Sequence, residues 1–140
     1  PSMRIMAIDY GDAHTGIAIS DPTGLLAGYT TVINAHRPEA VIQQIAQLAK
    51  EYGVEELVLG HPVNMDGTLG PRSEKAHAMK TLLESAIPLP VILWDERRTT
   101  IDAHNILFNS GKNAKQRKKV VDAVAASLIL EGYLSYRKNH

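Results

Sequence analysis

The sequence contains no cysteine and few aromatic residues, which make up 5% of the chain. The absence of cysteine excludes disulfide bonds and thiolate metal sites, and it suits a reducing cytoplasm. Neither sign of charge is in excess, because 15 basic residues face 15 acidic ones, so binding to nucleic acid has to come from a local patch. No apolar run reaches the roughly 18 residues of a membrane helix. We therefore expect a cytoplasmic protein with no membrane partner.

A chain of 140 residues that is 44% apolar can bury one core and is too short for two. Pro1 and Ser2 precede Met3 and are interpreted as residues left by cloning. No repeat, low-complexity segment or long linker divides the remainder. The sequence therefore predicts a single domain over residues 3–138.

Hydrophobic periodicity predicts three strands at the start of the chain and then alternating helices and strands. The expected strands cover residues 4–9, 15–21, 25–33, 56–60 and 90–94, and the expected helices cover residues 38–52, 73–85, 99–108 and 120–136. This βββαβαβαα order predicts an α/β protein with a mixed five-stranded sheet and helices on its faces.

Three carboxylates occupy positions where burial would normally exclude a charge. Asp9 ends the first strand, Glu96 follows the last strand, and Asp122 lies within an otherwise apolar stretch of the final helix. If the first and last strands lie near the sheet centre, Asp9 and Glu96 leave the sheet at the same edge, where the final helix would present Asp122. Converging carboxylates repel one another unless a divalent cation neutralises them, and oxygen ligands favour Mg²⁺ or Mn²⁺. Taken singly, each acid has an alternative: Asp9 could be a turn former, Glu96 could form an ion pair with Arg97 or Arg98, and Asp122 could be a favourable charge near a helix N-terminus.

Two segments are candidates for contact with phosphate groups. Residues 112–119 contain five bases and no acid just before the final helix, although most such runs are solvated loops. The loop 64–72 carries glycines whose amides suit an anion ahead of the second helix. The residues predicted to contact nucleic acid are Asn64, Gly67, Thr68, Arg72, Arg97, Lys112, Lys115, Arg117, Lys118 and Lys119.

Four ordered blocks, MRIMAIDYGDAHTGIAISD, LVLGHPVNMDGTLGPR, VILWDERRTT and KKVVDAVAASLILEGYL, together resemble the YqgF family, also called RuvX. The resemblance runs over residues 3–136. It implies a ribonuclease H-like fold and hydrolysis of phosphodiester bonds that depends on Mg²⁺ or Mn²⁺, with two ions per site. The family's acidic triad falls on Asp9, Glu96 and Asp122, and by the two-metal hypothesis Asp9 bridges the ions while the other two acids each hold one.

The same resemblance implies two substrates, since family members are described as pre-16S rRNA nucleases and as Holliday junction resolvases. The expected partners are RNA in ribosome biogenesis, with ribosomal particles, or branched DNA in recombination. The chain is expected to be a monomer or a weak homodimer. A nucleic-acid-binding module without activity remains the alternative of another class, whereas an ATPase of the sugar-kinase type would need a second domain.

The loop that modulates the predicted site departs from the family pattern. Gly11, His14 and Gly16 belong to this loop, and Gly11 and Gly16 are expected to let the chain reverse beside Asp9. Where the family usually carries one or two bases, this chain reads Asp12-Ala13-His14-Thr15. A phosphate contact there is expected to be weaker, or to depend on pH through His14.

Overall fold

The computed structural model describes residues 3–24, 27–62, 70–96 and 114–139, with side chains in the last segment described from Val121 onward. Its elements are β1 (Ile5–Asp9), β2 (His14–Ser20), β3 (Ala27–Asn34), α1 (Pro38–Tyr52), β4 (Glu56–His61), α2 (Pro71–Ala86), β5 (Val91–Asp95) and α4 (Ala114–Asn139). The helix predicted over residues 99–108 lies outside the described residues.

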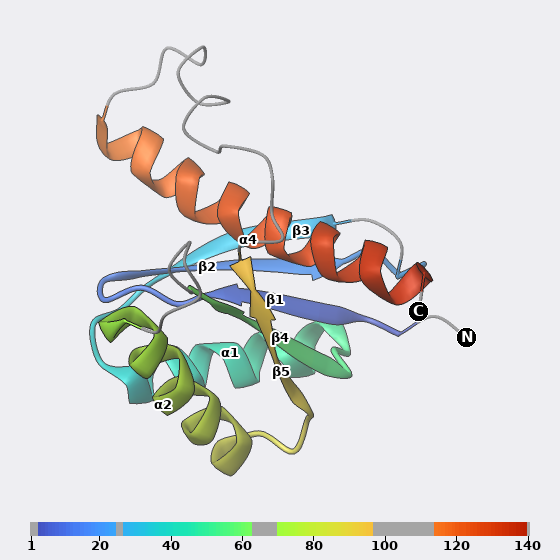
Figure 1. The fold of residues 1–140 in the computed structure, drawn as a ribbon, viewed down its shortest axis with the longest axis horizontal. Helices are drawn as coiled ribbons and strands as arrows, with labels where there is room; N and C mark the ends of the chain where they lie inside the picture. Colours follow the sequence, from blue (N-terminus) through green and yellow to red (C-terminus); the bar gives the residue numbers. More distant parts are fainter. Residues whose placement is uncertain (1–2, 25–26, 63–69, 97–113, 140) are drawn as a thin grey trace.

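The strands form one five-stranded sheet in the order β3-β2-β1-β4-β5 (Figure 1). β2 is antiparallel to both β1 and β3, whereas β1, β4 and β5 run parallel to one another. The predicted mixed α/β sheet is therefore confirmed. The premise that the last strand lies near the sheet centre is wrong, because β4 pairs between β1 and β5 and leaves β5 at the edge. The carboxyl ends of the three parallel strands nevertheless lie at the same end of the sheet.

Alternating side chains divide the core into two layers, one on each face of the sheet. Met6 and Ile8 of β1 pack with α1 and α2, whereas Ile5 and Ala7 pack with α4 on the opposite face. Figure 1 shows α1 and α2 on one side of the sheet and α4 on the other. Continuing the alternation by one step places Asp9 on the α4 face. The acid at the end of β1 therefore points toward the final helix.

Local signals explain the bounds of α1, which match the prediction at both ends. Pro38 starts the helix, where its missing N–H costs no hydrogen bond. Gly53 ends it in the left-handed conformation at φ 66° and ψ 38°, and its amide donates to the carbonyls of Ala49 and Lys50. α2 begins at Pro71, two residues before the predicted start at Ser73, for the same reason as α1.

The start of α4 corrects the interpretation of the basic segment as a stretch that precedes the final helix. α4 begins at Ala114, six residues before the predicted start at Val120. Lysine, glutamine and arginine are good helix formers, so the helix continues through a run that lacks apolar periodicity. Most of the basic segment therefore belongs to the first turns of α4. Although α4 is 26 residues long, no helix in the described part of the chain is apolar enough over its length to cross a membrane.

Candidate active site

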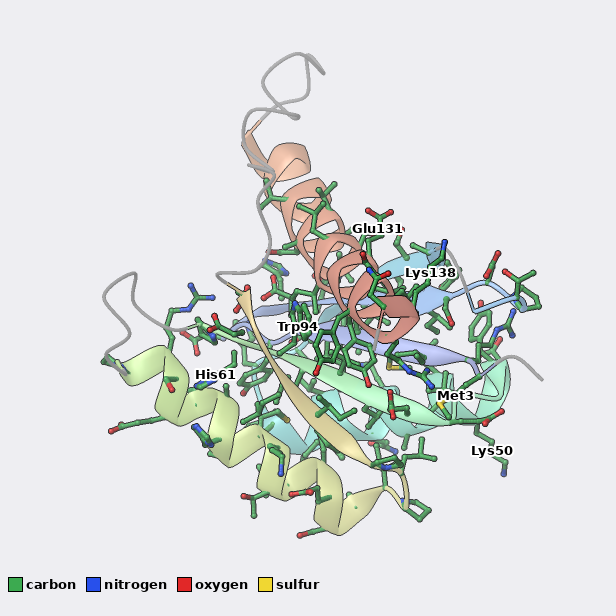
Figure 2. The ribbon with its side chains drawn as sticks, turned by 45° about the vertical axis from the view of Figure 1, so that its right-hand side comes forward. Met3, Lys50, His61, Trp94, Glu131 and Lys138 are labelled. Carbon is green, nitrogen blue, oxygen red and sulfur yellow. The ribbon has the colours of Figure 1, made fainter. Side chains whose placement is uncertain are left out.

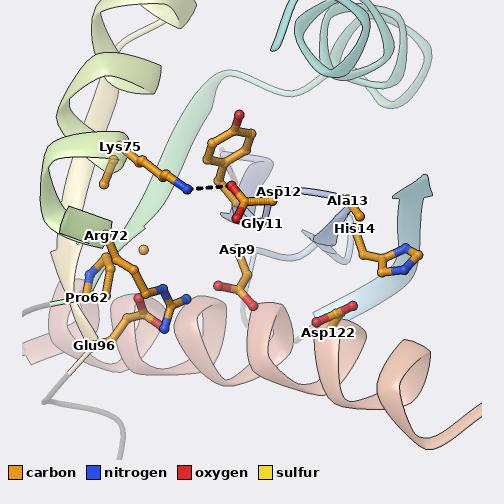
Figure 3. Close-up of a pocket in the computed structure, with 13 residues that line it drawn as sticks. Asp9, Gly11, Asp12, Ala13, His14, Pro62, Arg72, Lys75, Glu96 and Asp122 are labelled. Atoms are coloured by element: carbon orange, nitrogen blue, oxygen red, sulfur yellow. Dashed lines mark hydrogen bonds and ion pairs between the residues drawn. The ribbon is translucent and has the colours of Figure 1, made fainter. Parts of the chain in front are cut away.

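A pocket of about 330 Å³ opens beyond the carboxyl ends of β1 and β4, between α2 and α4 (Figure 3). It is lined by Asp9, Tyr10, Gly11, Asp12, Ala13, His14, Gly60, Pro62, Arg72, Lys75, Ala76, Glu96 and Asp122. The structure thus brings all three predicted acids to one pocket, from β1, from the residue after β5 and from α4. Arg72 is the one predicted nucleic-acid contact whose described side chain joins them.

Gly60 of β4 makes room for the carboxylate of Glu96. Gly60 pairs with Trp94 in the β4–β5 register, two residues before Glu96. A Cβ atom at position 60 would lie 3.2 Å from Cδ of Glu96 and 2.7 Å from Cδ1 of Ile129. Since real Cβ atoms essentially never come within 3.0 Å of another heavy atom, any side chain here would displace the end of the Ile129 side chain and crowd the acid. The bare backbone of β4 therefore leaves space for Glu96 on the α4 face.

Gly16 plays the corresponding part for Asp122, and this corrects the expectation that it helps the chain reverse. Gly16 lies inside β2, paired with Asp9 across the β1–β2 ladder. A Cβ atom at position 16 would overlap the carbonyl oxygen of Asp122 and lie 2.7 Å from its carbonyl carbon. The backbone of α4 therefore rests directly on β2 beside Asp9. This close approach brings Asp122 to the pocket.

The other end of the α4 contact is held by Trp94, which Figure 2 shows between the sheet and the helix. Its ring meets that of Tyr133 edge-on, with the centroids 5.6 Å apart. The hydroxyl of Tyr133 donates to a carboxylate oxygen of Glu56 at 2.7 Å. These contacts and the close approach at Gly16 fix α4 at both ends of its path over the sheet.

Burial and mutual repulsion raise the pKa values of two acids of the pocket, Asp9 and Glu96. Burial is the main cause that raises the pKa of Asp9 from 3.8 to about 7, and the charges of Glu96 and Asp122 add to it. Burial also raises the pKa of Glu96, with a further contribution from Asp95. The guanidinium of Arg72 opposes both shifts. Asp9 is thus a carboxyl group whose ionisation costs free energy at neutral pH unless another cation joins it.

The wall of the pocket that faces the acids is basic. Arg72 and Lys75 extend from the first turns of α2, and Figure 3 shows the guanidinium of Arg72 beside Glu96. Lys75 donates from Nζ to Oδ1 of Asp12 at 2.7 Å. Lys75 was not among the residues predicted from the sequence. The signal that could have found it is its spacing from Arg72, since residues three apart share one helix face.

A hydrogen bond between His61 and Ser73 ties the end of β4 to the first turn of α2. Nε2 of His61, labelled in Figure 2, lies 2.6 Å from Oγ of Ser73, which is 1% exposed. The ring of His77 meets that of His61 edge-on at 4.8 Å. Burial, and then the charge of His77, lower the pKa of His61, which favours the neutral ring. Because Ser73 follows Arg72 directly, this bond positions the basic wall, a role that no pattern in the sequence indicated.

The first loop is a tight turn at the mouth of the pocket. A Cβ atom at Gly11 would overlap the carbonyl oxygen of His14, so only glycine fits while the chain reverses here. Nδ1 of His14 lies 2.6 Å from Oδ1 of Asn34 on β3. His14 therefore lines the pocket while its ring is held by the neighbouring strand.

Several predicted contacts are not tested by the described residues. Asn64, Gly67, Thr68, Arg97 and Lys112 lie outside them. Lys115, Arg117, Lys118 and Lys119 belong to the first turns of α4, where only the backbone is described. Within the described ranges, no group of three or more histidine, aspartate or glutamate side chains forms a ready-made metal site. Asp9, Glu96 and Asp122 line one pocket without converging on a single point.

The fold defines the class of protein. The structure is similar to that of RuvC from T. thermophilus in complex with a Holliday junction substrate, with a TM-score of 0.63 over 96% of each chain. The two sequences are 12% identical, so this similarity shows the fold alone. The chain has the ribonuclease H-like fold that the family resemblance implied.

The family follows from the sequence comparisons. The family model described as "RuvX: Holliday junction resolvase" matches residues 3–136. A protein of Halothermothrix orenii is 46% identical over 135 residues, which cover 96% of each chain. A protein of Listeria monocytogenes serotype 4b is 45% identical over 134 residues, which cover 94% of this chain and 97% of the other. Both are named "Putative pre-16S rRNA nuclease". The chain belongs to the RuvX family and is a nuclease, a hydrolase of phosphodiester bonds.

Proposed function

We propose that the chain cleaves RNA at the pocket of Asp9, Glu96 and Asp122 with the help of divalent cations, and that its substrate is the 5′ end of pre-16S rRNA. One observation carries the proposal. Three acids from separate parts of the sequence line one pocket, opposite two basic side chains of α2. Acids alone would repel a phosphate group, whereas an acidic wall with cations and a facing basic wall can hold one.

The donor chemistry of the pocket fits Mg²⁺ or Mn²⁺. Carboxylate oxygens are the ligands that these ions prefer. Burial, and then the charges of Glu96 and Asp122, raise the pKa of Asp9 although Arg72 opposes the shift, and a bound divalent cation would favour the ionised carboxylate. Figure 3 shows Asp9 between Glu96 and Asp122, and these three carboxylates would hold the ions. When bound, such ions activate a water molecule for attack on phosphorus and stabilise the leaving oxygen.

The remaining residues of the pocket have roles that need no bound metal. Arg72 partly neutralises Asp9 and Glu96, and it faces the space where a phosphate group would enter. The bond between His61 and Ser73 holds the helix turn that carries Arg72. The bare backbone at Gly16 lets α4 approach β2, and the bare backbone at Gly60 leaves room for Glu96 beside β4.

Precursor RNA is favoured over branched DNA by the names of relatives that are 45–46% identical over nearly the whole chain. The description of the family model names the Holliday junction, which makes branched DNA the second candidate. The two differ in the assembly they require. A resolvase that cuts a two-fold symmetric junction needs a symmetric pair of sites, whereas an enzyme that trims one RNA end does not.

The test compares labelled RNA carrying the 5′ leader of pre-16S rRNA with a four-way DNA junction, each with Mg²⁺, Mn²⁺ or EDTA. We expect metal-dependent cleavage of the RNA that is lost in Asp9→Asn and Asp122→Asn and kept in Glu84→Gln, a control on the outer face of α2. Undiminished cleavage in both acid variants would overturn the site. Cleavage of the junction alone would overturn the RNA substrate, and metal-independent binding without cleavage of either would favour a non-catalytic module.

A further inference from the structure

The ion pair between Asp12 and Lys75 crosses the mouth of the pocket. Asp12 lies in the tight turn after β1, Lys75 lies on α2, and the two residues are 63 positions apart in the sequence. Figure 3 shows Lys75 reaching from the helix wall toward the turn, above Asp9. The pair therefore links two walls of the proposed active site.

Lys75 shares the basic wall of the pocket with Arg72. Arg72 and Lys75 are three residues apart on α2, and both line the pocket. Arg72 is close enough to Asp9 and Glu96 to lower the pKa of both. The charge of Lys75 is instead engaged by Asp12, whose pKa it lowers through their hydrogen bond.

The ion pair between Asp12 and Lys75 is exposed to solvent, so another anion can replace Asp12 as the partner of Lys75. Its side chains are 54% exposed at Lys75 and 78% exposed at Asp12, so water and salt compete with the contact. A phosphate group offers the ammonium a charge-assisted hydrogen bond of the same kind, with more acceptor oxygens than one carboxylate. A Cβ atom at Gly11 would overlap the carbonyl oxygen of His14, so the turn that carries Asp12 is tight.

We propose that Lys75 and Arg72 form a subsite for a backbone phosphate of the nucleic acid strand, and that Asp12 occupies Lys75 until the phosphate displaces it. The inference rests on the proposed function, because it assigns a contact for the same substrate in the same pocket. Beyond that contact, it assigns Asp12 as a competitor of the phosphate group for Lys75. The strand is held by Lys75 only when its phosphate outcompetes Asp12, which makes binding at this subsite sensitive to the identity of residue 12.

The test is a double-mutant cycle on RNA binding, measured by fluorescence anisotropy in EDTA so that no cleavage occurs. The probes are the labelled leader RNA and the four-way DNA junction. Lys75→Met is expected to weaken binding by roughly three- to tenfold and to reduce the slope of log affinity against log salt by about 0.7 on a single strand. Asp12→Asn is expected to tighten binding a few-fold, because it frees Lys75.

The double variant separates the proposed competition from a general effect of charge. If Asp12 acts through Lys75, the gain from Asp12→Asn shrinks when Lys75 is already methionine. An equal gain in both backgrounds would overturn the proposal, since it would mean that Asp12 only repels the strand. The matched control is the Lys80–Glu84 pair of the same helix, at 3.2 Å, which does not line the pocket. Glu84→Gln is expected to leave binding unchanged.

The outcomes also distinguish this proposal from the proposed function. The wild-type protein could cleave the RNA while Lys75→Met leaves the affinity and the salt slope unchanged. That result would refute the subsite and leave the nuclease assignment standing. A subsite that behaves as expected without any metal-dependent cleavage would refute the proposed reaction and leave the subsite standing. Binding of neither probe by the wild-type protein would overturn both.

Discussion

Replacing Asp9 with asparagine should stabilise the metal-free protein above neutral pH. The pKa of Asp9 is raised from 3.8 to about 7 in the folded protein, so the folded state holds its proton where the unfolded state has released it. The free energy of unfolding therefore falls as pH rises from about 4 through about 7. The difference between the two pKa values, at about 1.36 kcal/mol per unit, gives a loss of roughly 4 kcal/mol in the limit. Asp9→Asn cannot ionise and escapes that loss.

The assay is urea unfolding in EDTA, followed by circular dichroism, at about pH 5 and about pH 8. We expect Asp9→Asn to exceed the wild-type protein in stability by about 2–4 kcal/mol more at the higher pH than at the lower. The control is Asp12→Asn. Lys75 lowers the pKa of Asp12, so the ionised Asp12 carboxylate stabilises the folded protein, and replacing Asp12 should lower the free energy of unfolding rather than raise it. Added Mg²⁺ should stabilise the wild-type protein and not Asp9→Asn. The same dependence on pH in Asp9→Asn and the wild-type protein would refute the account of buried charge at Asp9.

Three further predictions concern the elements that position the pocket. Gly16→Ala should destabilise the protein by about 1–3 kcal/mol in urea unfolding, because its Cβ meets the backbone of α4, whereas Gly132→Ala, whose Cβ would lie 3.4 Å from Trp94, should have a smaller effect. Tyr133→Phe should cost about 1 kcal/mol by the same assay through loss of the hydrogen bond to Glu56, and an unchanged midpoint would contradict it. Ser73→Ala should raise KM for RNA more than it lowers kcat, since its bond to His61 positions the basic wall. The opposite split would assign Ser73 to the chemical step.

The sequence predicted those parts of the fold that depend on neighbouring residues. Both bounds of α1 follow from Pro38 and Gly53, which act within one turn of the helix. The start of α4 was missed because the prediction followed apolar residues, whereas the helix also includes residues 114–119 of the basic segment. The edge position of β5 depends on pairing between distant strands, and hydrophobic periodicity carries no information about that.

The candidate site shows the same division. Asp9, Glu96 and Asp122 could be singled out because a charge in an apolar run is visible in the sequence. Their common pocket depends on the parallel direction of β1, β4 and β5 and on the bare backbone at Gly16 and Gly60. The ion pair between Asp12 and Lys75 joins residues that are far apart in the sequence, so no local pattern indicates it.

The central claim is that the acids of one pocket carry metal-dependent cleavage. It is tested most directly by single-turnover cleavage of the leader RNA in Mg²⁺ by the wild-type protein and Asp122→Asn, with RNA binding measured on the same samples. The account predicts that the variant loses roughly a hundredfold or more in rate while its affinity for the RNA is kept. A variant that cleaves at the wild-type rate would contradict the account.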